Sequence, residues 1–360
     1  MLSPPNVMSN KRTLDSFFGP APGKKQRVSP HDDEHADPGS AQTSFSRHST
    51  YPHPIADLPA SVHDELASLP GRPGRAIDDQ ADLDLLYFEP YIPAGLAPTL
   101  FRHLRASLPF YRVEYTIQRY GVETHIRTPR YTTVFGLDAT ARFGGDDDGT
   151  VVDAATRQPV PAAAYARCAP RPLPACLDAL RRSAEAACGC AFNFCLVNYY
   201  ASGADSISYH SDDERFLGPE PAIASFSLGA RRDFFMKHKP PPAAKKGKGK
   251  GKGREAEAEA EAELEMETVT AKALLACKQV KLPLGSGDMV LMRGKTQANW
   301  LHSVPKRTGR NEKDGGRINI TFRKAMVKGG TDNYYNYNVG RGPVYRWNDL
   351  AKEMTLWKKT

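Results

Sequence analysis

The feature that most constrains this chain is the stretch of residues 194–215, FCLVNYYASGADSISYHSDDER. Its apolar run carries Asn198 and Tyr200, a Ser-Gly turn follows, and a second short segment delivers His210 and Asp212. Side chains two positions apart in an extended segment point the same way, so this imidazole and this carboxylate face a common point. Two histidines and one carboxylate leave open positions on a bound iron. The spacing therefore predicts the start of a metal site whose second histidine comes from elsewhere.

The His-x-Asp spacing is weak evidence by itself, because it also occurs at residues 31–33 and 35–37. Those copies lie in a polar segment whose composition would not hold them in place. Taken alone, the spacing favours an ordinary histidine that is hydrogen-bonded to a neighbouring acid. His302, in the segment NWLHSVP, is the candidate for the second histidine.

The formal net charge of +8 is concentrated in two regions. Residues 301–360 hold 13 Lys and Arg against 5 Asp and Glu, and residues 101–130 hold 6 Arg against 2 Glu. Localised basic surface indicates a nucleic-acid partner more strongly than diffuse basicity does. A merely solvated charged face is the alternative.

Cysteine usage and hydrophobic content bound the class of protein. The six cysteines contain no Cys-x-x-Cys pair, which indicates reduced thiols in an intracellular protein. The sequence does not begin with a secretory signal and has no apolar run long enough to span a bilayer, so we expect no membrane association. Hydrophobic residues make up 40% of the chain, slightly few for a wholly globular protein, so we expect part of it to be tail.

Residues 1–80 are rich in Pro, Ser, His and Asp, and we expect them to be disordered. Within them, residues 11–18 (KRTLDSFF) place three apolar side chains on one face of a helical turn, as a docking peptide would. This segment resembles the motif by which repair and replication proteins bind the sliding clamp, except that Lys11 stands where that motif usually has Gln. An accidental apolar cluster is the alternative. Residues 24–27 (KKQR) are a short candidate nuclear-import signal.

Periodicity predicts an ordered domain at residues 83–328, with helices mostly before its strands. An apolar run at 83–88 opens this domain. Helices are expected at 96–108 and 173–187, and strands at 111–120, 129–136, 194–200, 222–228, 232–237, 280–284, 289–292 and 317–323. A low-complexity insertion at 240–268 interrupts the domain, and a basic, aromatic extension follows at 329–360. This order fits a mainly β (α+β) fold, the double-stranded β-helix or jelly roll, with its site at the mouth.

Residues 317–323, RINITFR, alternate between polar and apolar side chains. The alternation puts Arg317, Asn319, Thr321 and Arg323 on one face of a strand. Guanidinium groups form charge-assisted and potentially bidentate hydrogen bonds with carboxylates, so this face is suited to binding a dianion. An edge strand with a solvated polar face would show the same alternation.

Several pieces in this order resemble the AlkB family of Fe(II)/2-oxoglutarate-dependent dioxygenases, specifically its eukaryotic DNA-repair branch of alkylated-DNA demethylases. The resemblance covers residues 83–324. Its most specific pieces are Asn198-x-Tyr200, the run YHSDDE at 209–214, LHSVP at 301–305 and RINITFR at 317–323. Pro129-Arg130 with Phe135-Gly136, and SLG at 227–229 before RDF at 232–234, also match.

The resemblance assigns roles to most of the residues above. It implies Fe(II) ligands at His210, Asp212 and His302, which are also the catalytic residues. It implies a 2-oxoglutarate site formed by Asn198, Tyr200, Arg317, Thr321 and Arg323. With O2, such an enzyme hydroxylates a methyl group on a base nitrogen, and formaldehyde, succinate and CO2 are released. The bases implied are 1-methyladenine and 3-methylcytosine in DNA, and the location implied is the nucleus.

Four residues are expected to contact the substrate. Asp213 matches a substrate-contacting acid, whose charge would favour a cationic methylated base. Tyr120 and Gly121 sit where relatives that act on duplex DNA place an aromatic wedge, which enters the gap left by a flipped base; a simple hairpin-tip aromatic is the alternative. Arg130 belongs to the Pro129-Arg130 match. Residues 334–338 (YYNYN) would stack on bases or pack on the barrel.

Three functions remain open from the sequence. The first is a DNA demethylase, acting as a monomer on duplex or single-stranded DNA and docking on the sliding clamp through residues 11–18. The second is the same oxygenase chemistry on RNA or a protein side chain. The third is a non-catalytic module that binds nucleic acid or the clamp, against which the intact ligand set argues.

Overall fold

The computed structural model describes residues 44–145, 149–165, 167–240, 274–307 and 315–358. These residues belong to one compact unit, Thr43–Thr360. The clamp-like segment at 11–18, the import signal at 24–27 and almost all of the insertion at 240–268 lie outside the described residues, so their predicted roles stay predictions.

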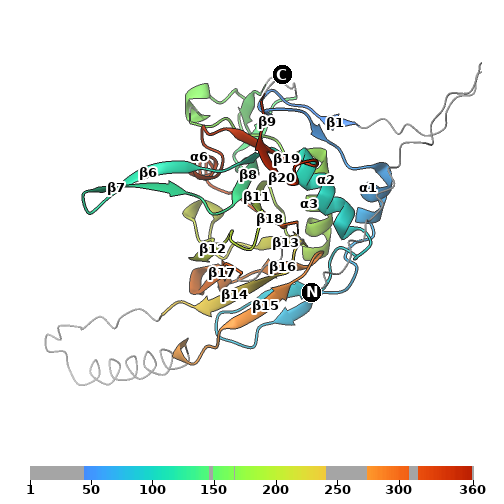
Figure 1. The fold of residues 1–360 in the computed structure, drawn as a ribbon, viewed down its shortest axis with the longest axis vertical. Coiled ribbons are helices and arrows are strands. Elements are labelled where there is room, and N and C mark those ends of the chain that lie inside the picture. Colours follow the sequence, from blue (N-terminus) through green and yellow to red (C-terminus); the bar gives the residue numbers. More distant parts are fainter. Residues whose placement is uncertain (1–43, 146–148, 166, 241–273, 308–314, 359–360) are drawn as a thin grey trace, which may run out of the picture. The chain divides into compact units, whose positions relative to one another are not determined.

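The larger of two main sheets has ten antiparallel strands in the order β20-β19-β5-β8-β11-β18-β13-β16-β4-β3 (Figure 1). Its strands are β3 (Arg75–Ile77), β4 (Leu85–Phe88), β5 (Phe110–Tyr111), β8 (Tyr131–Gly136), β11 (Phe194–Tyr200), β13 (Ile223–Gly229), β16 (Met289–Met292), β18 (Arg317–Arg323), β19 (Val344–Asn348) and β20 (Glu353–Leu356). Because β11, β18 and β13 lie in its middle, their side chains are buried on both faces.

The smaller main sheet has the order β12-β17-β14-β15. Its strands are β12 (Ile207–His210), β14 (Arg232–His238), β15 (Val280–Leu284) and β17 (Trp300–Val304). Three separate strand pairs complete the β structure: β1 (Phe45–Ser46) with β2 (Ile55–Ala56), β6 (Glu114–Arg119) with β7 (Val122–Arg127), and β9 (Ala141–Phe143) with β10 (Val151–Asp153). The two main sheets confirm the predicted mainly β, jelly-roll architecture.

The helices Ala60–Leu66, Ala97–Ser107 and Ala175–Cys188 cover one face of the larger sheet. The helices are α1 (Ala60–Leu66), α2 (Ala97–Ser107), α3 (Ala175–Cys188), α5 (Thr296–Asn299) and α6 (Asp332–Asn338), with 3-10 turns η1 (Ala162–Tyr165) and η2 (Arg215–Leu217). Leu100 and Leu104 of α2 and Leu177 and Leu180 of α3 are fully buried in one core with the apolar side chains of β18. The two long helices lie where their apolar spacing predicts them. In the described part of the chain, no helix is both long and apolar enough to cross a membrane.

The position of β18 decides between the two interpretations of its alternating sequence. It pairs with β11 on one side and β13 on the other, so it is not an edge strand. Ile318, Ile320 and Phe322 pack in the core beneath α2 and α3. The polar side chains therefore point away from that core, into the space that the larger and smaller sheets enclose.

The expectation of disorder through residue 80 is wrong for residues 44–80. This segment contains β1, β2, α1 and β3. Tyr51, Ile55, Val62 and Leu66 pack in the same core as α2 and α3. The Tyr51 hydroxyl also donates a hydrogen bond to the carbonyl of Pro172, at 2.7 Å. These few apolar residues are widely spaced among polar ones, so composition alone hides the segment's contribution to the core.

Candidate active site

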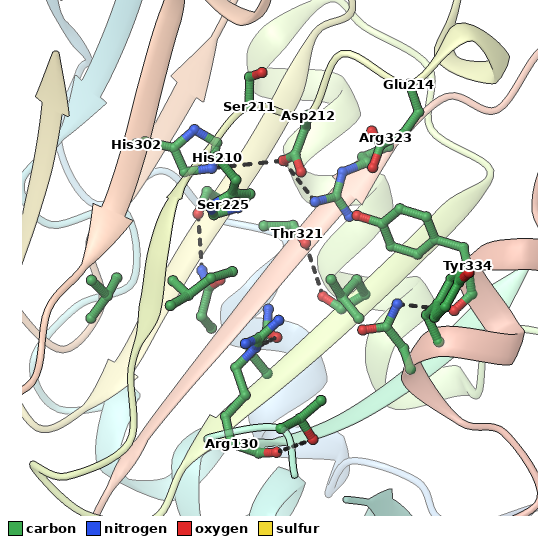
Figure 2. Close-up of a pocket in the computed structure, with 18 of the residues that line it drawn as sticks. Arg130, His210, Ser211, Asp212, Glu214, Ser225, His302, Thr321, Arg323 and Tyr334 are labelled. Atoms are coloured by element: carbon green, nitrogen blue, oxygen red, sulfur yellow. Dashed lines mark hydrogen bonds and ion pairs between the residues drawn. The ribbon is translucent and has the colours of Figure 1, made fainter. Parts of the chain in front are cut away.

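Three potential metal ligands converge between the two sheets (Figure 2). His210 ends β12 and His302 lies in β17, and the two residues are directly opposite each other in the antiparallel pair. Their ring centroids are 4.2 Å apart. One ligand atom from each of His210, Asp212 and His302 lies within 4.8 Å of the other two. The structure thus brings together the three residues that the sequence proposed for iron.

Asp212 reaches this cluster through contacts that strand alternation does not supply, because β12 ends at His210. Its backbone N–H donates to the Oε1 atom of Gln297, at 2.9 Å. Its carboxylate accepts a hydrogen bond from Nη2 of Arg323, at 2.7 Å. Gln297 lies in α5 and is buried, and no motif identified it from the sequence. The two contacts hold the backbone and the carboxylate of Asp212 in place, and both come from elements far along the chain.

The electrostatics favour the protonation states that bind a metal. Burial by itself would raise the pKa of Asp212, but the Arg323 guanidinium and His302 hold that pKa well below its usual range. Burial, reinforced by the charge of His210, lowers the pKa of His302 to about 3. A carboxylate and a neutral imidazole are the forms that ligate divalent iron, so the donor set fits such an ion.

A cavity of about 1000 Å³ extends from these ligands along the polar face of β18. It brings together most of the residues singled out from the sequence, which are Asn198, Tyr200, Arg130, His210, Asp212, His302, Arg317, Thr321 and Arg323. Asp213, Tyr120 and Gly121 do not line it.

Arg317 has unused hydrogen-bonding capacity inside this cavity. Its Nη2 donates to Ser227 Oγ at 2.8 Å, whereas its Nε and Nη1 have no partner among the described residues. Burial lowers the pKa of Arg317 to about 10, which still leaves a cation at neutral pH. A buried guanidinium with free donors is costly unless an anion completes its hydrogen bonds. This side chain therefore fits one carboxylate of a small dianion such as 2-oxoglutarate.

Other residues assigned to the co-substrate are held mainly by the protein. Arg130 donates from Nε to Asn198 Oδ1 at 2.8 Å, and Thr321 donates from Oγ1 to the carbonyl of Leu196 at 3.0 Å. These bonds position Asn198 and Thr321 in the cavity wall. Their direct contact with 2-oxoglutarate stays a prediction, as does the contact of Arg130 with the substrate.

The neighbouring acids Asp213 and Glu214 lie in different surroundings. Asp213 is exposed, and its carboxylate accepts a hydrogen bond from Lys239 Nζ at 2.7 Å, outside the cavity. Glu214 lines the cavity, and its buried Oε2 has no partner among the described residues. Burial, and next the charge of Asp212, raise the pKa of Glu214. The contact of Asp213 with the substrate stays a prediction, and Glu214 is a second acid at the site that the sequence did not single out.

Tyr120 and Gly121 occupy the tip of the β6–β7 hairpin, which projects from the body (Figure 1). Both have positive φ angles, 51° and 78°, which suit a tight turn between strands. The Tyr120 side chain is fully exposed. The predicted strand at 111–120 is thus divided between β5 in the sheet and β6 in this hairpin. Whether Tyr120 acts as a wedge stays a prediction.

Helix α6 forms part of the cavity wall. Neither alternative for residues 334–338, stacking on bases or packing on the barrel, describes all of them. Tyr335 is buried against the barrel, and its hydroxyl donates to the carbonyl of Gly136 at 2.9 Å. Tyr334, Tyr337 and Asn338 line the cavity. The Arg323 guanidinium lies 5.3 Å from the centre of the Tyr334 ring (Figure 2). Part of the extension packs, and part faces the site.

Comparisons with known proteins agree with a site for iron and 2-oxoglutarate. Residues 84–323 match the family described as the 2OG-Fe(II) oxygenase superfamily. "DNA oxidative demethylase ALKBH2" of Arabidopsis thaliana is 30% identical over 253 residues, which cover 70% of this chain and 69% of that relative. "Alpha-ketoglutarate-dependent dioxygenase alkB homolog 3" of Homo sapiens is 36% identical over 147 residues, 41% of each chain. "DNA oxidative demethylase ALKBH2" of Homo sapiens is 33% identical over 158 residues, 44% of this chain and 49% of that relative. The matches to these two human relatives span less than half of each.

Proposed function

This chain belongs to the 2OG-Fe(II) oxygenase superfamily, and we propose that it is a demethylase that repairs N-alkylated bases in DNA. The observation that carries the proposal is the meeting of His210, Asp212 and His302 in a cavity that also holds the free donors of Arg317. The names of the plant and human relatives support DNA as the substrate.

Each part of the cavity has a task in this reaction. Iron held by the two histidines and Asp212 supplies, with O2 and 2-oxoglutarate, the oxidation of a methyl C–H bond. Arg317 binds the far carboxylate of 2-oxoglutarate, and Arg323 keeps Asp212 ionised and in place. The products are succinate, CO2, formaldehyde and the base without its methyl group.

Glu214 supports a cationic base as the substrate. Its unpartnered Oε2 lies in the same cavity as the metal ligands, where the methyl group has to be placed. A methyl group on the ring nitrogen gives 1-methyladenine and 3-methylcytosine a positive charge. A carboxylate in a partly buried cavity attracts such a cation more strongly than it would in water. Glu214 thereby becomes a second candidate for the role that the sequence suggested for Asp213.

The finer parts of the proposal concern where and on what form of DNA the enzyme acts. We place it in the nucleus as a monomer, docked on the sliding clamp through residues 11–18. Duplex DNA is the preferred form if Tyr120 fills the gap that a flipped base leaves. A fluorescent fusion with and without residues 24–27 tests the location, and a pull-down with Phe17→Ala and Phe18→Ala tests the clamp.

A panel of oligonucleotides tests the substrate. Purified protein is incubated with Fe(II), 2-oxoglutarate and air, and with DNA and RNA strands that each carry one methylated base. We expect mass spectrometry to show loss of the methyl group from 1-methyladenine and 3-methylcytosine in DNA. Turnover of RNA strands alone would move the enzyme to an RNA substrate, and turnover of neither would refute the proposal.

A further inference from the structure

A second cavity, of about 460 Å³, opens beside the first. It is lined by Arg112, Val113, Glu114, Tyr115, Asn336, Tyr337, Gly340, Arg341, Gly342, Pro343 and Tyr345. Tyr115 and Tyr337 line both cavities, so the two spaces meet at a shared rim. Its volume lies within the range of sites that hold small ligands. A ligand there would be an immediate neighbour of whatever occupies the main cavity.

The helix α6 forms the partition between the two cavities. It is anchored by Tyr335 on Gly136 and by a hydrogen bond from Thr132 Oγ1 to the carbonyl of Asn338. Successive residues of a helix are rotated by about 100°. Tyr334 and Asn338 therefore face the main cavity, Asn336 faces the second, and Tyr337 stands between them, as the lining residues show. The anchoring makes the partition a fixed part of the fold.

The free charge in the second cavity is positive. Arg112 donates to Asp205 at 3.1 Å, and Glu114 accepts from Arg127 at 2.8 Å, so these groups are already paired. Arg341 is exposed and makes no hydrogen bond or ion pair with any residue that the structure describes. An unpaired guanidinium at such a cavity complements a phosphate.

Aromatic surface accompanies this charge. Tyr337 is 62% exposed and Tyr115 is 44% exposed, although both are large and apolar. Exposed aromatic rings beside a free cation are the combination that binds single-stranded nucleic acid, because bases stack on the rings and the cation holds the backbone. The volume admits one nucleotide rather than a duplex.

We propose that the second cavity is the subsite for the nucleotide next to the damaged base. Tyr337 and Tyr115 contact the neighbouring base, and Arg341 contacts the phosphate that joins the two nucleotides. This assignment rests on the proposed function, because it needs a methylated base in the main cavity. Adjacent nucleotides of one strand are covalently linked, so their subsites have to adjoin. The two cavities meet this requirement because they share a rim.

Affinities for short ligands test the subsite without any turnover. Full-length protein with Fe(II) and 2-oxoglutarate is kept under nitrogen and titrated with the nucleoside 1-methyladenosine, which carries no phosphate. It is also titrated with two dinucleotides that place an unmodified neighbour on the 5′ or the 3′ side of 1-methyladenosine. We expect one dinucleotide to bind about tenfold more tightly than the nucleoside, the size of one stacking contact.

Arg341→Ala and Tyr337→Ala should each remove most of that tenfold gain. Arg102→Ala is the matched control, because Arg102 is exposed on α2 and lines neither cavity. It should keep the gain.

The outcomes separate this inference from the proposed function. Equal affinity of the wild type for all three ligands, or no binding of any, would overturn the subsite. An equal loss for the nucleoside and the dinucleotides in Arg341→Ala would also overturn it, because Arg341 would then act elsewhere. A dinucleotide gain that Arg341→Ala abolishes, in a protein that fails to demethylate DNA, would uphold the subsite and refute the demethylase.

Discussion

Two ion pairs of nearly equal length lie in opposite surroundings. Arg323 and Asp212 are 2.7 Å apart in the main cavity, where their side chains are 2% and 4% exposed. Arg127 and Glu114 are 2.8 Å apart on the β6–β7 hairpin, where their side chains are 49% and 40% exposed. The two distances are nearly equal, and the two pairs differ in their exposure to water. Water screens the hairpin pair and leaves the cavity pair nearly unscreened.

The difference teaches what each region contributes. Removing one partner of a buried pair leaves an uncompensated charge. Substitution of Arg323 would therefore also disturb the position of Asp212. The hairpin pairs only with itself, and a free two-stranded hairpin is marginally stable. The cavity therefore holds its charged side chains in fixed positions, as a catalytic site requires. The hairpin suits contact with a partner outside the fold.

The largest effect on stability should come from Arg323→Leu. In metal-free protein, we expect the free energy of unfolding to fall by about 3–5 kcal/mol, because Asp212 is left buried and unpaired. Urea denaturation measures it. The lowered pKa of Asp212 adds stability that is complete above the ordinary aspartate value of about 4 and is lost as the pH falls below it. The difference between wild type and variant should accordingly shrink in acid, and a loss under 1 kcal/mol at pH 7 would contradict the buried-pair account.

Arg317→Met should have the opposite balance of effects. We expect 2-oxoglutarate binding to weaken by about 2–5 kcal/mol, since the variant loses the pairing of a buried cation with a carboxylate. Stability without ligand should fall much less than in Arg323→Leu, because Arg317 bonds only the neutral hydroxyl of Ser227 and its removal leaves no buried charge without its partner. Calorimetric titration and urea denaturation give the two numbers. Unchanged co-substrate affinity with weakened DNA binding would move Arg317 to the nucleic-acid surface.

Tyr120→Ala should affect duplex DNA alone. If Tyr120 fills the stacking gap, repair of a methylated base in a duplex should lose about 1–3 kcal/mol of stabilisation, while single strands are repaired normally. Stability should not change, because this side chain contributes nothing to the core. Val122→Ala is the matched control, because Val122 lies beside the same tip and is 64% exposed. Equal losses on both forms of DNA would make Tyr120 an ordinary hairpin aromatic.

Arg127→Leu should have the smallest effect. An exposed ion pair contributes about 0.2–1 kcal/mol, so we expect the free energy of unfolding to change by no more than that. Raising the salt concentration should erase the difference. A loss as large as that of Arg323→Leu would remove the contrast between the two regions.

Patterns within single strands could be predicted from the sequence. In β18, the alternation of Arg317 to Arg323 correctly separates the cavity face from the core face, because a central strand obeys a period of two. His302 was identified from a short motif, and the sheet register brings it opposite His210. These features depend on neighbours within a few residues or on one strand pair.

Positions set by contacts far along the chain could not be predicted. Asp213 and Glu214 follow the end of β12, and their directions depend on Lys239 and on the packing of the cavity wall. Gln297 supports Asp212 from 85 residues away. The role of α6 was missed for the same reason, since only the fold shows which tyrosine is anchored and which is free.

The most direct test of the account counts two products in one reaction. The protein is incubated with Fe(II), 2-oxoglutarate, O2 and an oligonucleotide that carries one 1-methyladenine, and succinate and repaired base are quantified together. We expect nearly one succinate per repaired base, and neither product from Asp212→Ala, whose circular dichroism should still show a folded protein. Repair that proceeds without 2-oxoglutarate, or wild-type repair by Asp212→Ala, would contradict the claim that this cavity holds the iron and performs the demethylation.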